Sequence, residues 1–174
     1  MTSGRPNQPY MEFSVNSPTG LHGYVQNNLT ISPGHTSNWI LKVANHMGKI
    51  QLVMITTRIG NLTTISPNST MPASALPVID RTEQFINDGD IANIGFTWTV
   101  TSLNQTNGLV FINMQINNRS IVASAPVGAR QGRDFRLIFE LWTFDPVSAS
   151  FEYGYTGETS QLGSWLQIWF NVTS

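Results

Sequence analysis

Apolar and polar residues alternate along several segments of strand length. From 94 to 101 a large apolar residue occupies every second position, with glycine or threonine between. Only an extended strand places such a series on one face, because successive side chains point to opposite sides of a sheet. Asn107-Gly108 favours a tight turn, and the alternation then resumes over 110–116. The stretch 94–116 therefore predicts a long β-hairpin with one buried face.

A second pair of alternating segments surrounds the turn-forming residues 45–48. The segments 39–43 and 50–54 each place apolar residues on one face, which predicts a second hairpin. Val53 and Ile55 also make the returning strand apolar on its other face. A strand of this kind is expected to be central in its sheet or covered on both sides.

Other parts of the chain carry the pattern less evenly. Prolines at 67, 72 and 77 interrupt the segment 60–77, which predicts a long surface loop. The segment 78–86 fits either a strand or a single helical turn, and the alternatives stay open. Further strands are predicted at 11–15, 135–141, 151–155 and 166–172, and shorter pieces at 21–26, 29–31 and 121–125.

Turn-bounded strands and the lack of a helical period predict the fold class. We expect an all-β, antiparallel two-sheet sandwich of jelly-roll type with roughly eight or nine strands. A closed barrel is the alternative. The 174 residues suit one domain, which we place at 10–174. The polar segment 1–9 is expected to be a flexible lead-in.

Composition narrows the classes of partner. Charged residues make up 11% of the chain, against roughly 25% in ordinary globular proteins, and the net charge is −1. Without a basic face we expect no nucleic-acid binding, and without a long apolar run no membrane insertion. The absence of cysteine excludes disulfides, thiolate metal sites and cysteine nucleophiles.

The last third of the chain predicts aromatic residues on an outer face. If the apolar residues of 135–141 and 166–172 point inward, their neighbours in sequence point outward. Outward aromatics between amides suit either contact with another subunit or stacking on sugar rings. Alternatively, a loop or the N-terminal segment of the same chain covers them. The candidate ligand or interface residues are Trp142, Tyr153, Trp165, Gln167, Trp169 and Asn171.

Three arginines lie close together in the sequence around Asp134. Arg130, Arg133 and Arg136 are therefore candidates for contact with an anion or an acidic sugar. A solvated loop with local pairing of arginine to Asp134 is the preferred alternative.

Two carboxylates, Asp88 and Asp90, flank Gly89 and form a weak candidate for calcium. The full spaced loop with its closing glutamate is missing, so a turn that solvates its own carboxylates is preferred and no metal is expected. The histidines at 22, 35 and 46 lack ligand spacing, and no Gly-x-Ser-x-Gly elbow occurs. We therefore expect neither enzymatic activity nor a cofactor.

In its architecture the chain resembles the protruding or spike β-sandwich domains of small non-enveloped virus coat proteins. The strands of 39–55, 94–116 and 135–172, separated by loops rich in Asn, Ser, Thr and Pro, carry this resemblance over the whole chain. A basic N-terminal arm is absent, which favours the projecting part of a coat protein over the shell.

The resemblance implies a structural domain at the virion surface, outside the cell when mature. Such a domain would self-associate as a dimer or trimer and present its loops to a host-cell receptor or glycan. A carbohydrate-binding module or lectin that uses the outward tryptophans is the alternative hypothesis.

Overall fold

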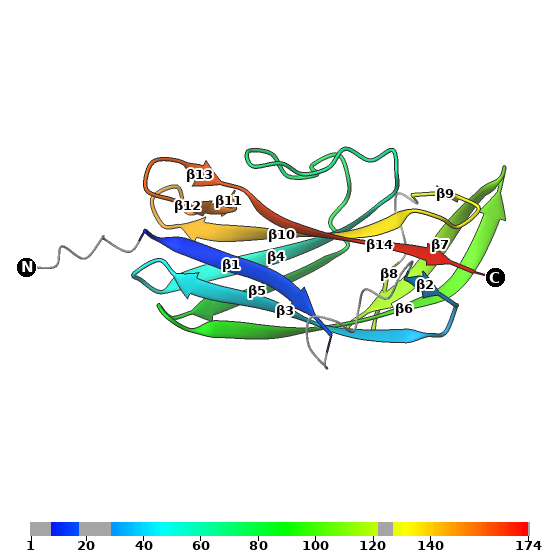
Figure 1. The fold of residues 1–174 in the computed structure, drawn as a ribbon, viewed down its shortest axis with the longest axis horizontal. Helices are drawn as coiled ribbons and strands as arrows, with labels where there is room; N and C mark the ends of the chain where they lie inside the picture. Colours follow the sequence, from blue (N-terminus) through cyan, green and yellow to red (C-terminus); the bar gives the residue numbers. More distant parts are fainter. Residues whose placement is uncertain (1–7, 18–28, 122–126, 174) are drawn as a thin grey trace, which may run out of the picture.

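A computed structural model describes residues 8–17, 29–121 and 127–173, in which two β-sheets pack face to face (Figure 1). The first sheet has the order β1-β3-β6-β7-β8, with β9 also paired to β7. Its strands are β1 (Tyr10–Asn16), β3 (Thr36–His46), β6 (Ile91–Thr106), β7 (Leu109–Ile116), β8 (Arg119–Ile121) and β9 (Ala129–Arg130).

The second sheet has the order β2-β14-β10-β4-β5, with β11 also paired to β10. A separate two-stranded sheet joins β12 (Tyr155–Thr156) to β13 (Gln161–Leu162). The strands of the second sheet are β2 (Thr30–Ile31), β4 (Gln51–Gly60), β5 (Asp80–Ile86), β10 (Phe135–Asp145), β11 (Ser150–Tyr153) and β14 (Ser164–Val172).

The predicted all-β sandwich is confirmed. All strand pairs are antiparallel except the short parallel pair of β2 with β14. The described residues contain 14 strands, more than expected, because several have only two to four residues and fall below the length at which alternation is visible. The undecided segment 78–86 contains the strand β5. The piece predicted at 21–26 lies outside the described residues, as do residues 122–125 of the piece predicted at 121–125 and residues 1–7 of the predicted lead-in 1–9.

The central hairpin is confirmed by the pairing of β6 with β7. Asn107 and Gly108 take positive φ values of 53° and 76°, as a tight hairpin turn requires. The inward residues on both strands are buried, from Ile94 to Val100 and from Ile112 to Ile116. A bulge between Val100 and Ser102 shifts the register, so the outer part of the hairpin departs from this alternation.

The second predicted hairpin is wrong, because β3 and β4 belong to opposite sheets. Strand β3 pairs with β1 and β6, whereas β4 pairs with β10 and β5. The side-chain amide of Asn45 donates hydrogen bonds to the carbonyls of Lys49 (2.9 Å) and Ile86 (2.8 Å), which holds the crossing between the sheets. Alternation shows which side of a strand is buried and not which strand lies beside it. The predicted central position of β4 is confirmed.

Aromatic rings join the two sheets in the core. Phe96 meets Phe139 edge-on with 4.9 Å between ring centroids, and Trp98 lies 5.0 Å from Phe170. Trp39 packs against Trp98 at 5.1 Å. Each such contact adds about 0.5–1.5 kcal/mol to the effect of burial alone. These rings come from β3 and β6 on one side and from β10 and β14 on the other, so the core depends on both sheets.

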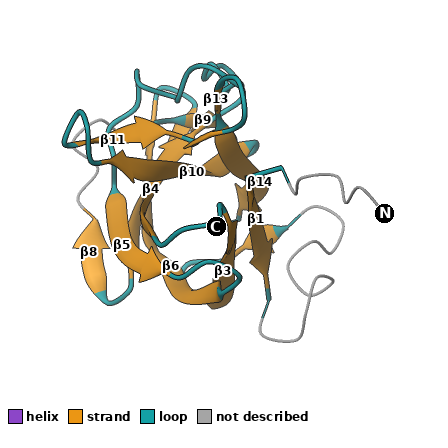
Figure 2. Ribbon diagram, turned by 90° about the vertical axis from the view of Figure 1, so that its left-hand side faces the viewer, coloured by secondary structure: helices purple, strands orange, loops and turns teal. Residues whose placement is uncertain are grey.

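The two sheets also approach each other at their margins (Figure 2). On one side β1 lies beside β14. On the other side β5 lies beside β8, where the guanidinium of Arg119 pairs with the carboxylate of Asp80. The core is therefore enclosed along both sides of the sandwich.

The segment 61–79, predicted as a surface loop, crosses the outer face of the second sheet (Figure 1). Glu140 on β10 is fully buried beneath it. One oxygen of Glu140 accepts a hydrogen bond from Ala73 N–H (2.5 Å), and the other accepts one from Arg58 Nε (2.9 Å). Arg58 also donates to the carbonyl of Leu76. The loop therefore forms a partial third layer over the sheet.

Candidate functional site

The outer face of the second sheet carries most of the predicted site residues, and the loop 61–79 divides it. Near the start of β10 lies the group that we name the Trp169 surface: Trp165, Gln167, Trp169 and Asn171. Near the end of β10 lies a group that we name the aromatic band: Ile50, Leu52, Phe85, Phe144 and Phe151. The loop is anchored between them through Glu140 and Arg58.

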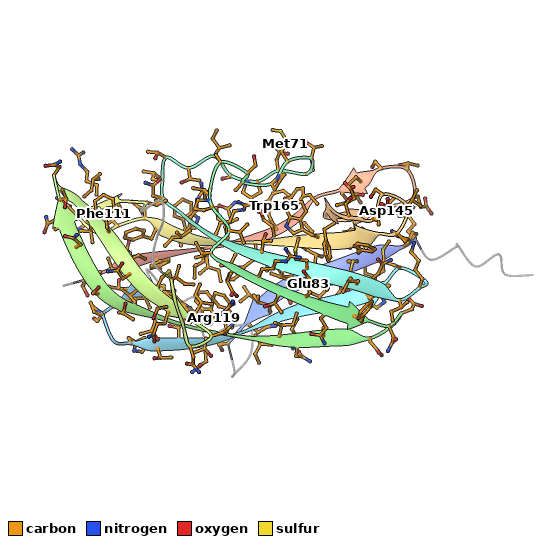
Figure 3. All side chains as sticks on the ribbon, turned by 180° about the vertical axis from the view of Figure 1, so that it is seen from behind. Met71, Glu83, Phe111, Arg119, Asp145 and Trp165 are labelled. Carbon is orange, nitrogen blue, oxygen red and sulfur yellow. The ribbon has the colours of Figure 1, made fainter. Side chains whose placement is uncertain are left out.

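The Trp169 surface follows from the alternation of β14. Ile168, Phe170 and Val172 point into the core and are buried, so the residues between them point outward. Trp169 is 43% exposed, and Trp165, Gln167 and Asn171 are half-buried. Gly163, just before β14, donates its N–H to the Ser69 carbonyl (2.7 Å). Trp165 accordingly lies close to the loop that carries Met71 (Figure 3).

Arg136 lies behind Trp169 and is only 2% exposed. Its guanidinium carbon is 4.8 Å from the centre of the Trp169 ring, within the range of a cation–π contact. Its Nη atoms donate to Gln167 Oε1 (2.5 Å), to Ser66 Oγ (2.7 Å) and to the carbonyl of Thr64. Burial lowers the pKa of Arg136. Arg136 is covered by the loop, so it is neither open to an anion nor part of the solvated loop that was the preferred alternative.

The other two arginines also fail to form one cluster with Arg136. Arg130 is on β9, opposite Leu109 of the first sheet. Arg133 is exposed and lines a depression of about 740 Å³ beside the end of β14. Three arginines in seven residues suggest proximity, but the turn at 131–134 separates Arg130, on a strand of the first sheet, from the buried Arg136 on the second. The depression is lined by Thr30, Gln131, Arg133, Asp134, Asn171, Val172 and Thr173.

The turn beside this depression has an unusual backbone. Gln131 and Asp134 take positive φ values of 54° and 61°, and Gly132 between them has a φ of 70°. A Cβ on Gly132 would lie 2.7 Å from the Val172 carbonyl oxygen, so only glycine fits there. The Asp134 N–H donates to Asn171 Oδ1 (2.9 Å). These contacts fix the turn against β14 and leave the Asp134 carboxylate exposed.

Trp142 and Tyr153 are covered by the chain itself. Trp142 Nε1 donates to Thr56 Oγ1 (3.0 Å), and its ring meets Tyr153 edge-on at 5.4 Å. The Tyr153 hydroxyl donates to the Asn68 carbonyl in the loop (3.1 Å). Burial, and to a lesser degree the charge of Glu140, raise the pKa of Tyr153. Covering within the chain, one of the alternatives drawn from the sequence, therefore applies to these two residues.

The aromatic band crosses four neighbouring strands. Phe85 on β5 pairs with Leu52 on β4, and Phe144 on β10 pairs with Phe151 on β11. Val53 pairs with Thr143 in antiparallel register, so Leu52, just before Val53, lies opposite Phe144, just after Thr143. The four side chains therefore form one row. The Phe144 and Phe151 rings lie 5.4 Å apart, edge to face. This row is a continuous apolar strip on the outer face.

Two members of the aromatic band are largely exposed. Phe85 is 66% exposed and Ile50, which precedes β4, is 58% exposed. The guanidinium of Arg81 lies 5.8 Å from the Phe151 ring and also pairs with Glu83 at the margin of the band. The sequence pattern does not identify Phe85, because the segment 78–86 fits either a strand or a single helical turn. Its strand assignment is what places Phe85 on the outer face.

The carboxylates of the weak calcium candidate accept hydrogen bonds from two neighbouring turns. Asp88 Oδ1 accepts a hydrogen bond from Gly48 N–H (2.7 Å), and Asp90 Oδ2 accepts one from Asn87 Nδ2 (2.9 Å). The described residues hold no group of three His, Cys, Asp or Glu side chains that is arranged to bind a metal ion. Asp90 therefore lies in a self-solvating turn of the predicted kind, whereas Asp88 bonds to the neighbouring turn at 45–48.

No protein-family model matches the chain, and no curated protein matches it significantly in sequence. Within the described ranges, no helix is long and apolar enough to span a membrane. The function of the chain is therefore inferred from the geometry of the outer face.

Proposed function

We propose that this chain is a structural domain of a virion surface, which self-associates through the aromatic band and presents loops for attachment to a host receptor. The observation that carries the proposal is the band itself. Five apolar side chains adjoin on the outer face, and Phe85 and Ile50 are more than half exposed. Monomeric proteins seldom leave large apolar patches bare, because such patches bind partners or aggregate.

The chemistry of the band suits contact between protein surfaces. Aromatic side chains are enriched in interface cores, where their large area and few rotatable bonds give strong binding at a low entropic cost. Arg81 and Glu83 pair with each other at the margin, so this pair adds no net charge to the band. Self-association is therefore expected to depend only weakly on salt.

The buried and turn carboxylates support a role other than catalysis. Glu140 is engaged by Arg58 and by the loop, and Asp80 by Arg119. Asp88 and Asp90 accept hydrogen bonds within turns. A carboxylate with its acceptor sites engaged in this way stabilises the fold, whereas general acid–base catalysis requires a group within reach of a substrate proton.

Size-exclusion chromatography with light scattering tests this proposal. The wild-type chain is expected to show twice or three times the monomer mass at high micromolar concentration and to dissociate on dilution. Phe85→Ser is expected to be monomeric over the same range, because it removes the most exposed ring of the band. Ile91→Ser is the matched control, since Ile91 is 59% exposed but lies on the first sheet.

Two results would contradict the proposal. One is a wild-type chain that remains monomeric at the highest concentration. The other is a Phe85→Ser variant with the same mass as the wild type while Ile91→Ser dissociates, which would place the contact on the first sheet.

A further inference from the structure

The exposed Trp169 ring and the depression of about 740 Å³ lie next to each other on one face. Trp169 and Asn171 are two residues apart on β14, so their Cα atoms are about 7 Å apart on the same side. Asn171 forms part of the wall of the depression. In the neighbouring strand β10, Arg136 pairs with Trp169. Asp134 lies two residues before Arg136, just ahead of β10. The ring and the depression therefore form one continuous surface.

Trp169 is held rigidly. The Arg136 guanidinium lies against its ring at 4.8 Å, and three acceptors in turn hold that guanidinium. A ring fixed in this way loses little conformational freedom when it binds a ligand. The ring keeps 43% of its surface exposed, which is available for stacking.

The depression offers both charged and neutral hydrogen-bonding groups. Arg133 contributes a cation and Asp134 an anion, so the two formal charges cancel. Gln131 has an amide, and Thr173 has a hydroxyl that can donate and accept. A volume of about 740 Å³ is within the range of roughly 300–1,000 Å³ that is typical of sites for small ligands.

We propose that Trp169 and this depression form a binding site for a neutral saccharide. A sugar ring presents an apolar face of C–H groups, which stacks on an exposed tryptophan, and hydroxyls that both donate and accept hydrogen bonds. Arg133 and Asp134 carry opposite charges, so the depression has no net charge to attract the carboxylate of a sialylated or uronic glycan, which favours a neutral one. This inference rests on the attachment role proposed above and identifies the ligand as a glycan.

An array of neutral and acidic oligosaccharides, followed by fluorescence titration with the best free neutral oligosaccharide, tests the site. Wild type is expected to bind neutral glycans and to show a change in tryptophan emission. Trp169→Ala is expected to weaken binding by roughly tenfold or more, since about 1.4 kcal/mol corresponds to tenfold. Asn171→Ala is expected to weaken it less, because its side chain positions the turn through the Asp134 N–H.

Ile50→Ser is the control, because Ile50 is exposed on the aromatic band, on the other side of the loop. It is expected to bind as the wild type does. Thermal unfolding followed by circular dichroism shows whether each variant is folded, and Trp169→Phe, which keeps a stacking ring, is expected to retain part of the affinity. The inference is overturned if neutral glycans give no signal with wild type, if only acidic glycans bind, or if Trp169→Ala binds normally.

The two proposals can fail separately. An oligomeric wild type without glycan binding would remove the saccharide site and leave self-association intact. A monomeric wild type that still binds free oligosaccharide would keep the saccharide site and remove self-association through the aromatic band. Free oligosaccharide is used in the titration because it measures each site singly, without avidity.

Discussion

Asp80 is a buried carboxylate at the margin of the second sheet. It pairs with Arg119 of β8, which is itself largely exposed. Desolvation raises the pKa of Asp80 above its ordinary value, and the attraction of Arg119 opposes this shift only in part. The folded chain therefore binds the Asp80 proton more tightly than the unfolded chain does. As a consequence, ionised Asp80 costs stability at neutral pH.

The variant Asp80→Asn tests this assignment, because its amide does not titrate. The wild-type residue imposes no such penalty below the ordinary carboxyl pKa, and the penalty grows as the pH rises through the raised folded pKa. We expect wild type to lose stability relative to Asp80→Asn as the pH rises from about 4 to about 7. Urea unfolding at several pH values measures this difference.

Asp90→Asn is the control, because Asp90 is exposed in a turn. A gap between wild type and Asp80→Asn that stayed constant with pH would contradict the assignment. A wild type that became more stable relative to Asp80→Asn as the pH rises would also contradict it.

At the residue scale, alternation predicted which side chains fill the core and which point away from it. Phe96, Trp98 and Phe170 are buried and Trp169 is exposed, as the two-residue period requires. It did not predict the burial of Arg136, because the atoms that cover Arg136 come from residues 64–66, seventy positions earlier. A period of two describes the sheet and contains no information about a layer laid over it.

At the scale of elements, the loop 61–79 is the feature that decides which outward residues remain available. It covers the buried Glu140 and Tyr153 and leaves Trp169 and Phe85 open to solvent. Its anchors are polar. They include the hydrogen bond from Ala73 N–H to Glu140 and that from Arg58 to the Leu76 carbonyl. The part of the loop around residues 73–76 is therefore held by the buried Arg58–Glu140 ion pair, while Arg136 and Tyr153 hold other parts of it.

Removing the Glu140 charge is expected to release this loop. Glu140→Gln leaves the Arg58 guanidinium buried without its carboxylate, a change that typically costs about 3–5 kcal/mol. Relative to wild type, we expect Glu140→Gln to have a lower free energy of unfolding. We also expect hydrogen exchange to accelerate more at the Ala73 amide than at the Trp98 amide in the core. Urea unfolding and amide exchange followed by NMR measure both effects.

Glu83→Gln is the matched control, since Glu83 pairs with Arg81 at an exposed position. Exposed ion pairs contribute only about 0–1 kcal/mol, so Glu83→Gln should change little. Unchanged exchange at Ala73 in Glu140→Gln would show that the loop is held by other contacts.

Pairing between elements was only partly predictable. The hairpin of β6 and β7 has a two-residue turn with left-handed backbone at Asn107-Gly108, a local signal that fixes the neighbour as well as the burial. The crossing from β3 to β4 has a turn of similar composition, but the contacts that define it join Asn45 to Ile86, forty-one residues away. Local turn chemistry could not distinguish a hairpin from a crossing between sheets.

At the scale of the whole molecule, the aromatic band and the Trp169 surface lie toward opposite ends of the same outer face. Arg136 and Phe144 are eight residues apart on β10, or about 27 Å along the strand. The loop 61–79 lies over the middle of β10, between its two ends (Figure 1). One end of the face can therefore be covered by another copy of the chain while the other end stays open to a ligand.

The absence of cysteine makes single-cysteine labelling a direct measurement of whether the aromatic band becomes covered. Ile50→Cys places a thiol in the band, and Gln115→Cys places one on the exposed side of β7 in the first sheet. At low protein concentration both thiols should be alkylated at similar rates. At high concentration we expect alkylation at position 50 to slow severalfold while that at position 115 stays constant. An Ile50→Cys rate that is independent of concentration, measured where light scattering shows an oligomer, would contradict assembly through the aromatic band.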